Sequence, residues 1–245
     1  MWLKVPDTVE KVLWEGPLEP ATDEAKRQLL EERGPKGERV DIRDLPVVSI
    51  GQPEVWPLAQ IYPKKGMPPA LKAKLAEADF YLVRLACSLR PRSDVVRLDW
   101  VRFLVHLLPD ESDRQPLAFD LHPLMVTQEV KRNVKVTLSP TLKFTELEAS
   151  IGGVEFGFEY PELQPVISGS GAGEADASWD YETPQGVHLQ GSRFMHVLVK
   201  APKGMPKGEA SLDLTADVEV RNAVLPFVIL PQQEGAEMPL VRLWG

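Results

Sequence analysis

The stretch 211–221, SLDLTADVEVR, alternates strictly between apolar and polar residues. Leu212, Leu214, Ala216, Val218 and Val220 share one parity, and every residue between them is polar or charged. Successive side chains of a β-strand point to opposite faces of its sheet. The stretch therefore predicts a strand with one face in a core and the other in solvent.

Alternation of this kind recurs in the second half of the chain at 134–138 and 154–160, and further strands are expected at 178–183 and 188–200. Turn-forming residues separate the runs at intervals of roughly ten residues, which is typical of an antiparallel β-sandwich. We therefore expect a mainly β protein, an antiparallel β-sandwich with a proline-rich N-terminal arm and one or two short helices.

The composition of the 245 residues excludes several classes of protein. With 43% hydrophobic residues the chain can bury a sizeable core, and 23 prolines disfavour an all-helical fold. The single cysteine, Cys87, excludes an internal disulfide and a zinc site of clustered thiolates, and we expect it to be a small buried hydrophobe. Because 36 acidic residues outnumber 28 basic ones, no nucleic acid is expected as a partner.

The chain divides by pattern into an arm, residues 1–66, and a β-sandwich body, residues 67–245. The arm contains one helix signal, from Asp23 to about Arg33, with Thr22 as its N-cap and Gly34-Pro35 after its end. Its remaining segments are punctuated by proline, and Trp2, Trp14 and Trp56 are expected to anchor them on the body.

Two segments of the body are less clear. A second short helix is predicted to begin at Pro68-Pro69, and 80–89 fits either a continuation of that helix or a strand; we favour the strand. A run to Leu108 then reads as another strand. The glycine-rich 168–173, SGSGAG, is expected to be a long loop.

Motifs for cofactors and metals are missing. No phosphate-binding glycine loop occurs, and the four histidines (His106, His122, His188 and His196) lack metal-ligand spacing. Asp120 and His122 would share a strand face, but no nucleophile motif accompanies them. We assign no catalytic, cofactor-binding or metal residue and expect no cofactor.

Three carboxylates suggest a hydrolase as one alternative. Asp176, Asp180 and Glu182 lie close together, and paired carboxylates can act on glycosidic bonds. In a strand, however, Trp179 and Tyr181 would face away from the acids and fill the core. Solvated acids beside core aromatics are the simpler interpretation, so an enzyme is uncertain and less favoured.

The segment 134–160 suggests a second alternative. Val134, Val136 and Leu138 alternate with polar residues, as do the apolar residues of 154–160, and Gly152-Gly153 is a turn signal between the runs. Strands of this length can cross a bilayer. A membrane is a partner only under this alternative, in which release of the arm frees the hairpin.

The favoured hypothesis is a non-catalytic β-sandwich that binds a protein partner, as a scaffold or accessory subunit. Its candidate contacts are aromatic anchors of the arm and arginines of the first hairpin, namely Trp14, Trp56, Arg90, Arg92 and Arg97. The first residues lack a basic start, an apolar core and a cleavage site, which predicts a cytoplasmic location.

Overall fold

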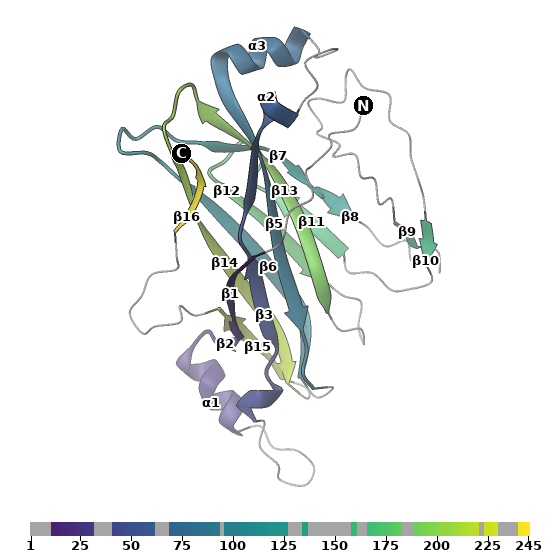
Figure 1. Cartoon of the computed structure of the whole chain (residues 1–245). Helices are drawn as coiled ribbons and strands as arrows, with labels where there is room; N and C mark the ends of the chain where they lie inside the picture. Colours follow the sequence, from purple (N-terminus) through teal and green to yellow (C-terminus); the bar gives the residue numbers. More distant parts are fainter. Residues whose placement is uncertain are drawn as a thin grey trace.

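Two antiparallel β-sheets packed face to face form the body of the molecule (Figure 1). The computed structural model describes residues 11–31, 41–61, 69–93, 96–126, 134–136, 158–160, 166–182, 189–220, 223–229 and 240–245. The fold is mainly β with few short helices, so the predicted antiparallel sandwich is confirmed.

The first sheet has six strands in the order β1-β3-β5-β13-β7, and β4 also pairs with β5. All its pairs are antiparallel, and the central pair β5–β13 aligns twelve residues of each strand. The bounds are β1 (Val12–Pro17), β3 (Val47–Gly51), β4 (Glu54–Pro57), β5 (Ala78–Arg90), β7 (Leu117–His122) and β13 (Gly191–Pro202).

The second sheet has eight strands in the order β2-β15-β14-β6-β12-β11-β8, and β16 also pairs with β14. A separate sheet contains only β9 (Val134–Val136) and β10 (Phe158–Tyr160). The bounds in the eight-stranded sheet are β2 (Glu19–Pro20), β6 (Val96–Leu108), β8 (Met125–Val126), β11 (Val166–Ser170), β12 (Asp176–Glu182), β14 (Gly208–Val220), β15 (Ala223–Val228) and β16 (Val241–Trp244).

The core lies between the two large sheets and follows the alternation of the sequence. On β14 the residues Leu212, Leu214, Ala216, Val218 and Val220 are all buried, whereas the residues between them are half-buried on the outer face. The matching parity of β5, β6, β12 and β13 completes the same cluster. The burial pattern predicted for 211–221 is therefore confirmed for 211–220, and residue 221 lies outside the described residues.

Short helices cover the ends of the sandwich. They are α1 (Asp23–Glu31), the 3₁₀ turn η1 (Ile42–Asp44), α2 (Leu58–Ile61) and α3 (Pro69–Glu77). Thr22 caps α1 as predicted, since its Oγ1 accepts a hydrogen bond from the backbone N–H of Ala25 at 3.1 Å. The predicted end of α1 near Arg33 and Gly34-Pro35 lies outside the described residues, as does Trp2. Figure 1 shows α1 and α3 at opposite ends of the molecule.

The described part of residues 1–66 contributes strands to both sheets. It contributes β1, β3 and β4 to the six-stranded sheet, and β2 pairs with β15 in the other. Trp14 is only 5% exposed and belongs to the main core. These strands close one side of each sheet rather than lying over a finished body.

Two local predictions have different outcomes. Residues 80–89 lie within β5, so the strand interpretation is confirmed. The expected loop at 168–173 is wrong for its first half, because Val166–Ser170 forms β11 and pairs with both β12 and β8. Gly169 suits that strand because a Cβ there would lie 2.9 Å from the backbone oxygen of Pro123. Only after Ser170 does the chain turn, at Gly171.

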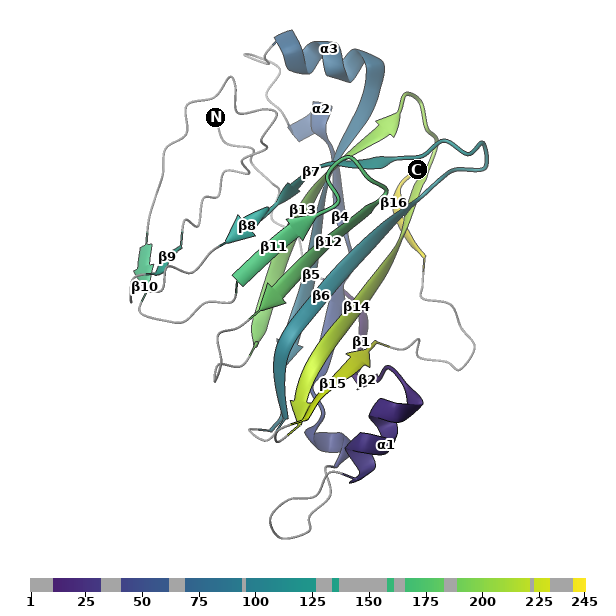
Figure 2. The same cartoon turned by 180° about the vertical axis from the view of Figure 1, so that it is seen from behind.

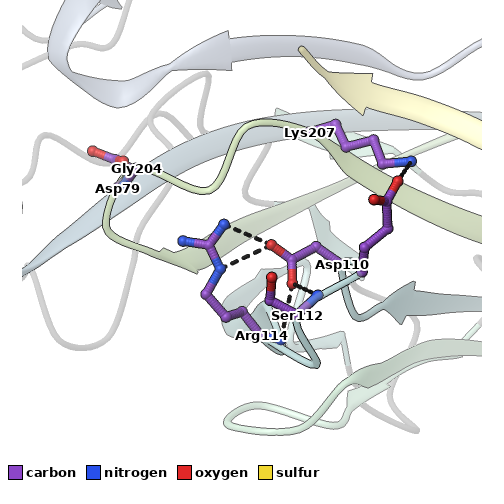
Figure 3. Close-up of polar contacts among 7 residues, drawn as sticks. Asp79, Asp110, Ser112, Arg114, Gly204 and Lys207 are labelled. Carbon is purple, nitrogen blue, oxygen red and sulfur yellow. Dashed lines mark hydrogen bonds and ion pairs between the residues drawn. The ribbon is translucent and has the colours of Figure 1, made fainter.

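Hydrogen bonds and ion pairs stabilise the loop between β6 and β7. Asp110 accepts hydrogen bonds from the backbone N–H groups of Ser112 and Arg114 and from the guanidinium of Arg114, and Lys207 reaches Glu111 at 3.3 Å (Figure 3). The hydrogen bond from Arg114 is the main cause that lowers the pKa of Asp110. The beginning of β7 is therefore held by a local polar network.

Candidate functional site

The five residues predicted to bind a partner do not form one surface. Trp14 is buried and offers almost no area to another protein. Trp56 is half-buried opposite Leu82 in the first half of β5, whereas Arg90 is the last residue of that strand.

Each predicted arginine has its own surroundings. Arg90 forms an ion pair with Glu15 at 2.9 Å, Arg92 is exposed in the turn after β5, and Arg97 lies opposite Glu219 in the sheet. Exposed ion pairs such as Arg90–Glu15 contribute little to stability. These arginines lie at the end of the sandwich where β5 finishes, whereas Trp56 lies near the end where β5 begins.

The carboxylates of the hydrolase alternative lie on the outer face of the eight-stranded sheet. Asp180 receives two hydrogen bonds from Arg102, the shorter at 2.8 Å, and Asp176 contacts Nδ1 of His106. Trp179 is fully buried behind them, as the sequence predicts. Both acids are thus engaged by side chains of β6, Asp180 by the guanidinium of Arg102 and Asp176 by the imidazole of His106.

Metal and membrane-helix sites were also sought in the described ranges. There, no three side chains of histidine, cysteine, aspartate or glutamate come together as metal ligands. Among the same residues no helix has the length and apolarity needed to span a membrane. Cys87 is buried as predicted, and burial raises the pKa of its thiol to about 12.

The place where the 134–160 segment leaves and rejoins the sandwich has a distinct structure. We call residues 123–126 together with β11 the hairpin root. Strand β8 ends at Val126 before the segment, β11 begins at Val166 after it, and the two strands pair antiparallel at the edge of the eight-stranded sheet. Beyond the root, β9 and β10 pair with each other and with no other strand among the described residues, and Figures 1 and 2 both show them to the side of the sandwich.

One hydrogen bond joins the two parts of the root, and a second attaches the root to the body. The N–H of Gly169 donates to the carbonyl oxygen of Leu124 at 2.7 Å, and the indole Nε1 of Trp179 donates to the carbonyl oxygen of Pro123 at 3.1 Å. Trp179 lies inside the core, so its indole connects the root directly to the packed interior.

The root also exposes apolar side chains. Leu124 is 42% exposed and Met125 is 68% exposed. Isolated exposed apolar residues are ordinary on protein surfaces, but here two adjacent ones lie in the strand pair from which the chain leaves toward the amphipathic segment. The sequence analysis missed this site, because only the pairing of β8 with β11 brings residues 123–126 to residues 166–170.

The segment itself was predicted as a hairpin, and its described ends pair as one. Val134 lies opposite Tyr160, Lys135 opposite Glu159, and Val136 opposite Phe158. The predicted turn at Gly152-Gly153 lies outside the described residues.

Comparisons with known proteins supply little. No protein-family model and no curated protein matches the chain. Among solved structures, Clostridium perfringens delta-toxin is similar at 12% identity, over 71% of this chain and 74% of that one, with a TM-score of 0.39. A pore-forming protein is similar at 9% identity, over 76% and 88%, with a TM-score of 0.37. The Clostridium perfringens NetB toxin in its membrane-inserted form is similar at 8% identity, over 76% and 86%, with a TM-score of 0.32. Similarity at these levels carries no argument about the function of this chain.

Proposed function

We propose that this protein is membrane-active and that its 134–160 segment enters the lipid bilayer as an amphipathic β-hairpin. The observation that carries the proposal is the pairing of β9 with β10 in a sheet of their own, joined to neither sandwich sheet among the described residues. An antiparallel pair held only by its own hydrogen bonds can move without breaking the sheets of the body.

The pattern of the segment supports this role. Apolar residues alternate with polar ones at 134–138 and again at 154–160. In a bilayer the apolar parity would face lipid, and the backbone groups would need partners in neighbouring strands. A tilted strand needs roughly 9–11 residues to cross the hydrocarbon layer, so insertion would have to extend the strands beyond the alternating runs 134–138 and 154–160.

The hairpin root supports it as well. Leu124 and Met125 are exposed in the root, which could present this apolar surface to a membrane. The sandwich then serves as a rigid scaffold from which the segment extends, and the proposal requires no catalytic residue.

Dye release from lipid vesicles tests the proposal. Vesicles of phosphatidylcholine, alone and mixed with phosphatidylglycerol, are loaded with a self-quenching dye and mixed with the full chain. The key variant is Phe156→Asp, which places a charge on the apolar parity and should reduce release severalfold because charges are unfavourable in hydrocarbon. The matched control, Thr137→Asp, places the same charge on the polar parity and should release dye like the unaltered protein.

The outcomes separate cleanly. Release that falls in Phe156→Asp and persists in Thr137→Asp would support insertion of the segment. If the vesicles stay intact with the unaltered protein, before and after limited proteolysis of the arm, the proposal fails. Equal release by the two variants would mean that some other part of the protein acts on the lipid.

A protein partner is the second candidate, favoured by a different observation. A hollow of about 60 Å³ on the outer face of the six-stranded sheet is lined by small side chains and flanked by Val12 and Phe194, both exposed. Such a hollow at the arm strand β1 fits an apolar side chain of another protein. Pull-down from cells with the unaltered chain and with Phe194→Asp tests it, and a partner retained equally by both would exclude this surface.

A further inference from the structure

Two histidines lie opposite each other where β7 meets β13. His122 is the last residue of β7, and the register places it directly across from His196 of β13. Their ring centroids are 6.3 Å apart. Strand β7 ends the path of the six-stranded sheet, so β13 is its only partner strand in the described part of that sheet.

Charged groups lie beside the two histidines on the same outer face of the six-stranded sheet. Arg84 of β5 lies across from His196 on its other side, and Glu54 of β4 forms an ion pair with Arg84. From β7 itself, Asp120 shares the face of His122, and its Oδ1 accepts the backbone N–H of Leu121 at 2.9 Å. His196 therefore lies between a guanidinium and a second imidazole, with Glu54 already paired to the guanidinium.

The surroundings favour neutral imidazoles. Nδ1 of His196 is buried and has no hydrogen-bond partner among the described residues. Burial lowers the pKa of His122, and burial together with His122 and Arg84 lowers the pKa of His196 to about 4. A proton added to His196 would create a like-charge contact with Arg84, and a proton added to His122 would place a charge in a largely buried position.

We propose that the His122–His196 contact is an acid-sensitive fastening, which holds β7 on β13 at neutral pH and releases this edge strand when either histidine is protonated. The proposed release of β7 rests on the arrangement of these side chains and does not depend on the proposed function. Its consequence for the membrane rests on the proposed function, because β7 leads through Pro123 directly into the hairpin root.

The sign and size of the effect follow from proton linkage. A histidine in the open state titrates near its ordinary value of 6.5, whereas His196 in the closed state titrates at about 4. The open state therefore binds more protons between these values, and opening increases as the pH falls below 6.5. For one histidine the increase is about tenfold per pH unit, hence about 30-fold at pH 5, and it levels off near pH 4.

Hydrogen exchange of backbone amides tests the fastening directly. Protection factors for β7, corrected for the intrinsic rate, are compared near pH 7 and near pH 5 in the full chain, with β14 as the internal reference. Because a histidine in the open state is already partly protonated at pH 7, we expect the protection of β7 to fall by about 20-fold between these values and that of β14 to stay constant. His196→Gln and His122→Gln should each weaken this pH dependence, whereas His106→Gln, on the other sheet, should keep it.

Two results would overturn the inference. One is protection of β7 that is the same at both pH values in the unaltered chain, a measurement that needs no variant to fold. The other is a pH dependence that persists in the double variant His122→Gln/His196→Gln.

Dye release at the two pH values separates this inference from the proposed function. Dye release that is equal near pH 7 and pH 5 would contradict a role of the histidines in membrane action and would leave the proposed function intact. No release at either pH, combined with acid-dependent exchange of β7, would end the proposed function and leave the fastening intact.

Discussion

Strand β14 and the 134–160 segment share the same alternation of apolar and polar residues, but they differ in the strands with which they pair. β14 pairs with β6 along nearly its whole length and with β15 on its other edge, and its apolar side chains fill the core. The described ends of the 134–160 segment pair only with each other. Alternation therefore specifies that a strand has an apolar face, but not what covers that face.

The largest expected effect concerns the covered face of β14. Leu214 is fully buried, so Leu214→Ala should lower the free energy of unfolding by about 3 kcal/mol through lost burial and a residual cavity. Thr215→Ala, on the outer face, should change it by less than about 0.5 kcal/mol. Urea titration measures both.

A second prediction concerns a disulfide cross-link that would hold the root of the segment closed. Gly169 and Leu124 are joined by a backbone hydrogen bond, so the neighbouring pair Met125 and Ser168 is the closer, non-hydrogen-bonded kind. The double variant Met125→Cys/Ser168→Cys should therefore form a disulfide across the root. We expect oxidation to suppress dye release and reduction to restore it, while Cys87 stays buried and unreactive.

The single variants Met125→Cys and Ser168→Cys are the controls for that experiment. They should respond to neither oxidant nor reductant. If the cross-linked protein releases dye at the full rate, the segment acts without opening its root.

A third prediction concerns how tightly the root is packed. Gly169→Ala adds a Cβ that would lie 2.9 Å from the Pro123 carbonyl oxygen, which should lower stability by about 1–3 kcal/mol and increase hydrogen exchange in β8. Ser170→Ala removes only the exposed hydrogen bond to Ser178 and should have a much smaller effect. Equal effects of the two variants would mean that the close approach at Gly169 is not a constraint.

The smallest expected effect is in the core behind β14. The hydroxyl of Tyr181 is buried and has no hydrogen-bond partner among the described residues, and burial raises its pKa. Tyr181→Phe should therefore leave stability unchanged or raise it by about 1 kcal/mol, because an unsatisfied buried group is removed. A loss above about 1 kcal/mol in thermal unfolding would show that the hydroxyl has a partner.

The sequence predicted those parts of the fold that local patterns determine. β14 and β12 were expected with their buried parities, and the acids Asp176 and Asp180 were expected to face away from Trp179. Residues 80–89 were ambiguous because both a heptad and a two-residue period fit them, and pairing with β13 decides for the strand.

Other features depend on residues that are distant in sequence. Gly169 was taken for a loop residue because its reason, the close approach of Pro123, lies more than forty positions earlier. Trp14 was expected as an arm anchor and also as a partner contact, and its burial fits the first role. His122 and His196 had no motif spacing, and only the register of β7 on β13 brings them together.

The central pair of the six-stranded sheet also has a consequence for how the chain folds. Leu85 and Met195, partners in β5 and β13, are about 110 residues apart in the chain. Closing so large a loop before gaining its contacts slows folding, so refolding should take milliseconds to seconds. During synthesis β5 must wait for its partner until residue 202 has left the ribosome. Over this interval β3 and β4 can cover one edge of β5, whereas the edge that β13 later occupies stays unpaired.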